Sequence, residues 1–121
     1  MAKVLYIEDI PDNAALAQKL LTHLGYEFLW AKNAEEGLAM ALESRPDLIL
    51  LDLGLPDIDG QTLSVWLRGE AVLEKTPIIV LTAWPEEVAR QTVDSYGLNG
   101  YLCKPFKMDS LKKILDANLG A

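Results

Sequence analysis

The stretch of sequence that predicts the fold is LILLD, residues 48–52, a run of four aliphatic side chains that ends at an acid. Three other short apolar runs also stop at polar residues: residues 4–7 before Glu8-Asp9, residues 78–81 before Thr82, and residues 101–103 before Lys104-Pro105. Short apolar runs separated by helical patterns are typical of parallel strands that are buried on both faces. Ligands bind at the carboxyl ends of such strands, where these polar residues would meet.

The regions between the apolar runs have helical spacing, so strands and helices are predicted to alternate along the chain. We predict a fifth strand over residues 27–31, and helices that contain residues 16–24, 38–42, 63–67, 88–96 and 111–119. Asn33 followed by Glu36 has the spacing of a capping box at the start of the second helix. The pattern therefore predicts an α/β fold of five β-α units in a single domain, residues 1–121.

Several single residues carry expectations about burial. Leu16 and Trp66 have helical spacing with other apolar residues, so both are predicted to face the core, and Cys103 is predicted to be a buried thiol in its strand. Trp30 and Trp84 are expected to be partly exposed. His23 has no partner residues in view and is interpreted as a solvated surface histidine rather than a phosphorelay or metal-binding residue.

The composition excludes several classes of protein. The chain has 121 residues, half of them hydrophobic, which suits one compact domain with a real core. It has 18 acidic residues against 11 Lys and Arg, and the resulting net charge of −7 argues against binding to nucleic acid. No apolar run approaches the length of a membrane span, so we expect a cytoplasmic protein that acts away from membranes.

The polar residues at the strand ends indicate a chemistry. Glu8, Asp9 and Asp52 would place three carboxylates close together, where they repel one another unless a cation neutralises them, and Mg²⁺ suits such oxygen ligands. Asp52 is the best placed nucleophile, since a carboxylate can attack phosphorus to give an aspartyl phosphate. Thr82 and Lys104 could each contact a phosphoryl oxygen. Each residue taken singly could equally be a helix cap or a solvated loop residue.

In order and spacing, these residues resemble the receiver domain of bacterial two-component response regulators, from Lys3 to about Leu119. The matching motifs are Glu8-Asp9, Asp52, Leu55-Pro56, Asp59-Gly60, Thr82-Ala83, and Tyr101 three residues before Lys104-Pro105-Phe106. The resemblance implies a doubly wound, flavodoxin-like (βα)5 fold with five parallel strands in the order 2-1-3-4-5.

The resemblance also implies a role for each acid. Asp52 would accept a phosphoryl group from a histidine kinase or a histidine phosphotransfer protein. Asp9, Asp52 and the Gly54 carbonyl would ligate Mg²⁺, or Mn²⁺ in its place, and Glu8 would act through a metal-bound water. The protein would be a phosphorylation-dependent switch that assists only its own phosphorylation and dephosphorylation, and it would not be a turnover enzyme.

The remaining residues of the pattern would detect and transmit the phosphorylation. Thr82 and Lys104 would sense the phosphoryl group, Tyr101 would move between an exposed and a buried rotamer, and the bond before Pro105 would be cis. The fourth helix, predicted to be the loosest, would form with the last strand and last helix the face that controls an unknown downstream protein.

Two positions depart from the common pattern of the family. Gly54 lies two residues after the acceptor, and Trp84 lies two residues after the threonine; in the family, side chains at both places help to set how fast water removes the phosphoryl group. Gly54 has no side chain to orient a water molecule. We hypothesise that Trp84 also shields the site, which would make the phosphoryl group comparatively long-lived.

Other functions remain open at this point. A receiver fold could act as a docking module that is never phosphorylated, although the intact set of acids, threonine and lysine argues against this. A flavodoxin-like flavin carrier needs a phosphate-binding loop after the first strand, where Glu8-Asp9 would repel a phosphate. A phosphatase with an aspartyl nucleophile usually has two aspartates one residue apart, whereas Asp52 is followed by Leu53 and Gly54.

Overall fold

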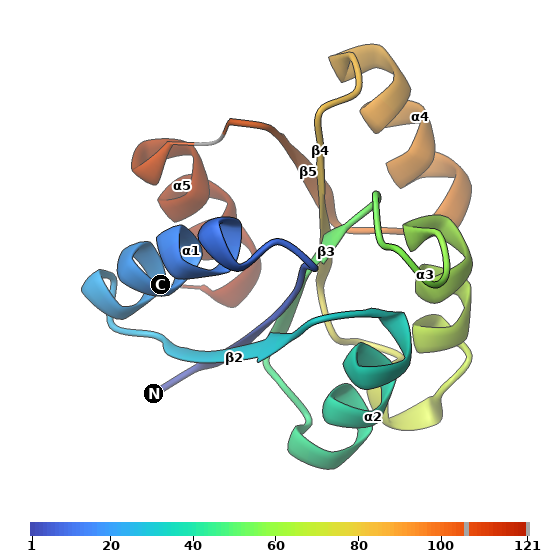
Figure 1. Ribbon diagram of the computed structural model, residues 1–121, viewed down its shortest axis with the longest axis horizontal. Helices are drawn as coiled ribbons and strands as arrows, with labels where there is room; N and C mark the ends of the chain where they lie inside the picture. The colour runs from blue at the N-terminus through green and yellow to red at the C-terminus, as the bar shows by residue number, and fades with distance from the viewer. Residues whose placement is uncertain (106, 121) are drawn as a thin grey trace.

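The computed structural model describes residues 1–105 and 107–120, and Phe106 of the motif above lies outside them. Within these residues five strands alternate with five α-helices (Figure 1). The strands are β1 (Lys3–Ile7), β2 (Glu27–Ala31), β3 (Leu48–Asp52), β4 (Ile78–Thr82) and β5 (Gly100–Cys103). The helices are α1 (Pro11–His23), α2 (Ala34–Ser44), α3 (Gly60–Arg68), α4 (Glu86–Tyr96) and α5 (Met108–Leu119), with a short 3-10 helix, η1, at Ala71–Leu73.

All the strand pairs are parallel, and the strands lie in the order β2-β1-β3-β4-β5. The predicted α/β fold and the strand order 2-1-3-4-5 are therefore confirmed. In this order β1 and β3 are neighbours, and Ile7 pairs with Leu51 at their carboxyl ends. The residues that follow β1 therefore lie beside the end of β3, at the point where the chain changes direction across the sheet.

The two faces of the sheet are covered by different helices. Helices α1 and α5 lie on one side, and α2, α3 and α4 lie on the other (Figure 1). Alternate residues along each strand supply the two cores: Leu5, Ile7, Ile49 and Leu51 pack on the side of α2 and α3, and Val4, Tyr6, Leu48 and Leu50 pack on the side of α1 and α5. In the described part of the chain, no helix has both the length and the apolar character that crossing a membrane requires.

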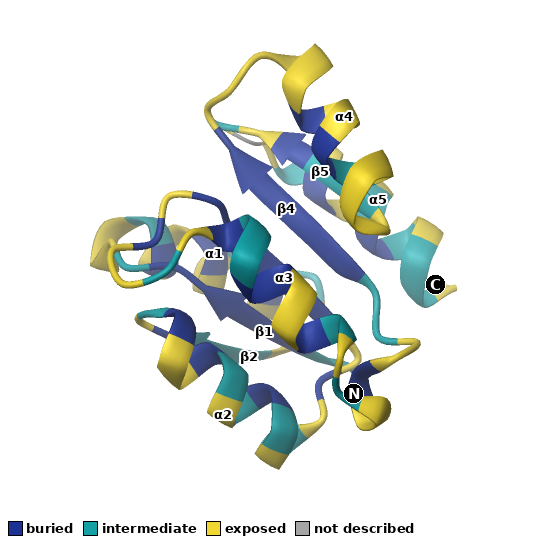
Figure 2. Cartoon of the chain, turned by 90° about the vertical axis from the view of Figure 1, so that its right-hand side faces the viewer, coloured by how far each residue is buried: buried dark blue, intermediate teal, exposed yellow. Residues whose placement is uncertain are grey.

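The central strands are continuous apolar runs because both of their faces are buried. Every residue of β3 and β4 is buried, whereas the helices expose their outward faces (Figure 2). The second helix is capped as the sequence predicts, because the Asn33 side chain accepts a hydrogen bond of 2.8 Å from the Glu36 backbone N–H. Helix α4 buries only Ala89 and Thr92, so it is weakly anchored by apolar contacts; its greater mobility remains a prediction.

Three of the expected core residues are exposed. Leu16 is 48% exposed because α1 buries Ala14, Ala17 and Leu21, a face that points away from Leu16. Trp66 is 42% exposed, since α3 turns its smaller residues Gly60 and Ser64, with Leu63 and Leu67, toward the core. Cys103 is exposed at the end of β5, one of the two edge strands of the sheet. His23 is exposed, Trp84 is 40% exposed and Trp30 is half-buried, as the sequence indicated.

We predict that Gly60→Ala destabilises the protein by about 1–3 kcal/mol, although alanine is the better helix former. A Cβ at residue 60 would lie 2.7 Å from the Leu53 Cα and 2.9 Å from the Asp52 carbonyl oxygen, and backbone cannot move aside as a side chain can. Urea denaturation measures the difference. The matched control is Gly69→Ala, where the nearest atoms are 3.5 Å away, and which should be neutral or stabilising by about 0.4–1 kcal/mol. Equal effects of the two substitutions would contradict this account.

Candidate functional site

Three carboxylates meet where the carboxyl ends of β1 and β3 lie side by side. Glu8 and Asp9 follow β1 directly, and Asp52 is the last residue of β3. One oxygen from each of the three lies within 4.8 Å of the others. Glu8 is fully buried, Asp52 is 5% exposed and Asp9 is half-buried. The structure therefore brings together the three acids that the sequence singled out.

Lys104 places a positive charge in this acidic cluster. Its Nζ atom lies 2.9 Å from Asp52 Oδ1 and 3.5 Å from Glu8 Oε1. The backbone N–H of Lys104 donates a 2.7 Å hydrogen bond to the Thr82 carbonyl oxygen, which fixes the end of β5 against the end of β4. The Lys104–Pro105 peptide bond is cis. The lysine offsets the cost of burying two neighbouring carboxylates.

Glu8 has supporting contacts that the sequence analysis did not find. The Asn13 side-chain amide donates a hydrogen bond to Glu8 Oε1, and the Trp30 indole N–H donates one of 2.7 Å to the Glu8 carbonyl oxygen. Asn13 lies five residues after Glu8 in the first turn of α1, a spacing that could have suggested this contact. Glu8 Oε2, in contrast, is buried and has no hydrogen-bond partner among the described residues.

The two buried carboxyls differ in their readiness to lose a proton. Burial and the adjacent Asp52 raise the pKa of Glu8 to about 7. Burial acts in the same direction on Asp52, but the neighbouring Glu8 carboxyl and the hydrogen bond and charge of Lys104 outweigh it and hold the pKa of Asp52 below its ordinary value. Asp52 therefore carries the negative charge of the pair and is the better nucleophile.

A cavity of about 270 Å³ opens beside Asp52. Its lining includes Asp9, Gly54, Thr82, Trp84 and Lys104, which are all candidate residues from the sequence. Thr82 is buried at the end of β4, and its Oγ1 atom accepts a 2.9 Å hydrogen bond from the Trp84 backbone N–H. The cavity can therefore admit a group the size of a phosphate next to a carboxylate, a hydroxyl and an ammonium.

The loop that carries Gly54 is attached to two helices. Asp57 accepts hydrogen bonds of 3.0 and 3.2 Å from the backbone N–H groups of Ala34 and Glu35, at the start of α2. Asp59 caps α3 by accepting a 2.8 Å hydrogen bond from the backbone N–H of Thr62. The role of Asp57 could not be read from the sequence, because the start of α2 lies more than twenty residues before Asp57.

Tyr101 lies on β5, away from the acidic cluster. Its hydroxyl donates a 2.7 Å hydrogen bond to Glu86 Oε1, in the first turn of α4, and the side chain is half-buried. Glu86 also accepts a longer contact of 3.4 Å from Arg90 on the same helix. The structure therefore connects Tyr101 to α4 through Glu86, a contact that the sequence did not predict.

The acidic cluster is compatible with a Mg²⁺ site. Its donors are carboxylate oxygens, the ligands that hard cations prefer, and the site opens to the cavity, so that waters could complete the coordination. The buried Glu8 Oε2, which lacks a partner among the described residues, is a further oxygen that a bound cation or its water could satisfy. Lys104 supplies only part of the positive charge that three carboxylates require.

Comparison with known proteins gives the class to which this fold and site belong. The sequence profile of the response regulator receiver domain matches residues 4–116. The chain therefore belongs to the response regulator receiver domain family of two-component signalling. Proteins of this family are signalling switches and not classical enzymes.

Individual relatives support this assignment over almost the whole chain. The polar-differentiation response regulator DivK of Brucella anthropi is 32% identical over 117 residues, which cover 97% of this chain and 95% of that protein. The structure is similar to chemotaxis protein CheY4 of Vibrio cholerae, with a TM-score of 0.91, 31% identity and 98% coverage of each chain. It is also similar to the receiver domain of sensor histidine kinase PA1611 of Pseudomonas aeruginosa, which was solved with a magnesium ion in its active-site cleft. The TM-score is 0.90 at 32% identity, and the match covers 99% of this chain and 98% of that chain.

We predict that Mg²⁺ stabilises the protein and that Asp9→Asn removes about half of this effect or more. A cation that binds only the folded state at about 100 times its Kd adds about 2.7 kcal/mol to the free energy of unfolding. Loss of one carboxylate should weaken Mg²⁺ binding by about tenfold or more. Each tenfold increase in Kd makes the free energy of binding less favourable by about 1.4 kcal/mol. Urea denaturation with and without Mg²⁺ measures the effect. Asp12→Asn, an exposed acid in the first turn of α1, is the control and should respond like the wild type. An equal Mg²⁺ response in Asp9→Asn would exclude Asp9 from the site.

Proposed function

We propose that the protein is a phosphorylation-dependent switch in which Asp52 accepts a phosphoryl group from a histidine kinase or a histidine phosphotransfer protein. The observation that carries this proposal is the position of Asp52. Its carboxylate is ionised, faces a cavity of phosphate size and lies 2.9 Å from a lysine ammonium. An acid placed only to cap a helix or to meet solvent would not need this arrangement.

The chemistry follows from these residues. A carboxylate oxygen of Asp52 attacks the phosphorus of a phosphohistidine, the new O–P bond forms as the donor's N–P bond breaks, and the histidine takes a proton as it leaves. Asp9, Asp52 and the Gly54 carbonyl would hold Mg²⁺, with Glu8 acting at longer range. When bound, the cation offsets the negative charge on the transferring phosphoryl oxygens.

The phosphoryl group would also change the partners of two side chains. Lys104 would move from the Asp52 carboxylate to a phosphoryl oxygen, and the Thr82 hydroxyl would donate to another. Each charge-assisted hydrogen bond is worth about 1.5–3 kcal/mol, so the two together supply about 3–6 kcal/mol. Shifting a two-state equilibrium from 1:99 to 99:1 takes about 5.5 kcal/mol. The available energy is therefore of the right order for a switch.

The readout would be the surface of α4, β5 and α5. If Thr82 moves toward the phosphoryl group, Tyr101 can exchange its hydrogen bond with Glu86 for a buried rotamer behind the threonine. Helix α4, which buries only two residues, can follow such a change at low cost. A downstream protein that binds this surface would then distinguish the two states.

We predict that acetyl phosphate and phosphoramidate each add one phosphoryl group to the protein in the presence of Mg²⁺, as measured by intact mass. The modification should be absent without Mg²⁺ and absent in Asp52→Asn. Asp94→Asn, an exposed acid on α4, is the control and should be modified like the wild type. If neither donor, nor a phosphorylated histidine phosphotransfer protein, modifies Asp52, then the receiver fold acts here as an unphosphorylated docking module.

We also predict a phosphoryl group that is long-lived and whose loss Gly54→Asn accelerates by about tenfold or more, because the amide could orient an attacking water. There is room for this side chain, since among the described residues, its two chain neighbours aside, a Cβ at residue 54 would have only Asp52 Oδ2 within 4 Å, at 3.9 Å. Trp84→Ala should also shorten the half-life, whereas Trp66→Ala, at a similar exposure on α3, should not. Loss of phosphate from the isolated phosphoprotein measures each half-life. A wild-type half-life of seconds would refute the shielding role of Trp84.

A further inference from the structure

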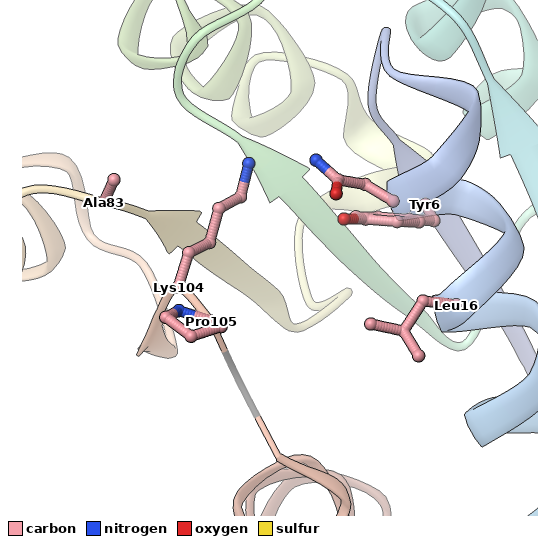
Figure 3. Close-up of a pocket in the computed structure, with 6 residues that line it drawn as sticks. Tyr6, Leu16, Ala83, Lys104 and Pro105 are labelled. Atoms are coloured by element: carbon pink, nitrogen blue, oxygen red, sulfur yellow. The ribbon is translucent and has the colours of Figure 1, made fainter.

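A second cavity, of about 320 Å³, lies next to the one that contains Asp52. Figure 3 shows Tyr6 and Leu16 on one side of this space, with Lys104 and Pro105 facing them from the other side. Ala83 and Asn13 complete its lining. Ala83 and Lys104 line both cavities, whereas Asp52, Thr82 and Gly54 line only the first. The second cavity is therefore a neighbour of the phosphoryl site and is not part of it.

The walls of the second cavity are mainly apolar. Leu16, Ala83 and Pro105 present hydrocarbon to it, and Leu16 is a large aliphatic side chain that α1 leaves 48% exposed. The volume lies at the lower end of the range for small-molecule pockets, which are also predominantly apolar with a few polar groups. The size and lining therefore suit a ligand of about one ring, held mostly by burial of apolar surface.

Tyr6 gives this cavity a specific polar feature. Its hydroxyl is buried and has no hydrogen-bond partner among the described residues. A buried hydroxyl without a partner costs free energy that an acceptor would recover. Tyr6 lines the cavity, and its hydroxyl end is directed toward the side on which Lys104 lies (Figure 3). A molecule in the cavity with an oxygen acceptor at its inner end would supply the missing partner.

The charges around the cavity favour an uncharged ligand. The contacts of Lys104 with Asp52 and Glu8 leave little net positive charge on this wall to attract an anion into the second cavity. The carboxylates of Asp52 and Glu8 would repel a negatively charged ligand, and so would the net charge of −7 on the whole chain. A cationic ligand would instead face the lysine ammonium on the cavity wall. An uncharged molecule avoids both penalties.

We propose that this cavity is a binding site for a small, uncharged, apolar molecule with one hydrogen-bond acceptor, to which the Tyr6 hydroxyl donates. The apolar part of the ligand packs between Leu16 and Pro105. A bound molecule lies against Lys104, the residue that also contacts Asp52. The site thus differs in ligand chemistry from the acidic, polar cavity that surrounds Asp52, and it requires neither Mg²⁺ nor phosphorylation.

The test uses acetophenone, an uncharged aromatic ketone, and follows the methyl signals of Leu16 and Ala83 by NMR on the intact chain. We expect saturable shifts confined to residues around the cavity, with a Kd of about 1 mM, a modest affinity for so small a molecule. Tyr6→Phe should weaken binding by about fivefold or more, because it removes only the hydroxyl. Tyr26→Phe, a tyrosine that does not line the cavity, is the matched control and should bind as the wild type does.

Two further measurements keep the proposal open to refutation. Leu16→Ala changes an exposed side chain, should fold normally, and should also weaken binding several-fold by removing one apolar wall. Benzoate, an anion with nearly the same shape as acetophenone, should bind about tenfold more weakly. The proposal fails if acetophenone gives no saturable shift at Leu16 and Ala83, if Tyr6→Phe binds as tightly as the wild type, or if benzoate binds as well as the ketone.

Discussion

The parallel pairing of β1 with β3 is the constraint on which the rest of this structure depends. It places the acids that follow β1 beside Asp52 at the end of β3, so that residues more than forty positions apart share one site. It also buries the centre of the sheet on both faces, because helices cover each side. The acidic site is therefore built at the ends of two strands in the buried centre of the sheet.

Burial of these acids creates an electrostatic problem that Lys104 solves only in part. A single ammonium cannot neutralise three carboxylates, and Glu8 responds with a pKa raised to about 7 while Asp52 remains ionised. The surplus of negative charge is the physical reason why a cation fits the site. The same lysine contacts Asp52 directly, so a group attached to Asp52 would lie next to the lysine ammonium.

The general fold could be predicted from the sequence because its signals are local. These signals are short apolar runs, helical spacing and the polar residue that ends each run, and each spans only a few positions. Together they predict five β-α units. Expectations about single helical residues were less accurate. Leu16 and Trp66 have apolar spacing, but the face that each helix turns inward depends on how closely it packs on the sheet. Small residues such as Ala17 and Gly60 occupy those faces because they allow the helix backbone to approach.

The sequence by itself determined the candidate site residues. Residue type and order along the chain identify Glu8, Asp9, Asp52, Thr82 and Lys104. Only the tertiary structure decided what surrounds them. Asn13 and Trp30 hold Glu8, Asp57 connects its loop to α2, and Glu86 binds Tyr101, through contacts between separate elements. Such contacts follow no periodicity in the chain, because they depend on the relative positions of helices and strands that the packing of the whole core sets.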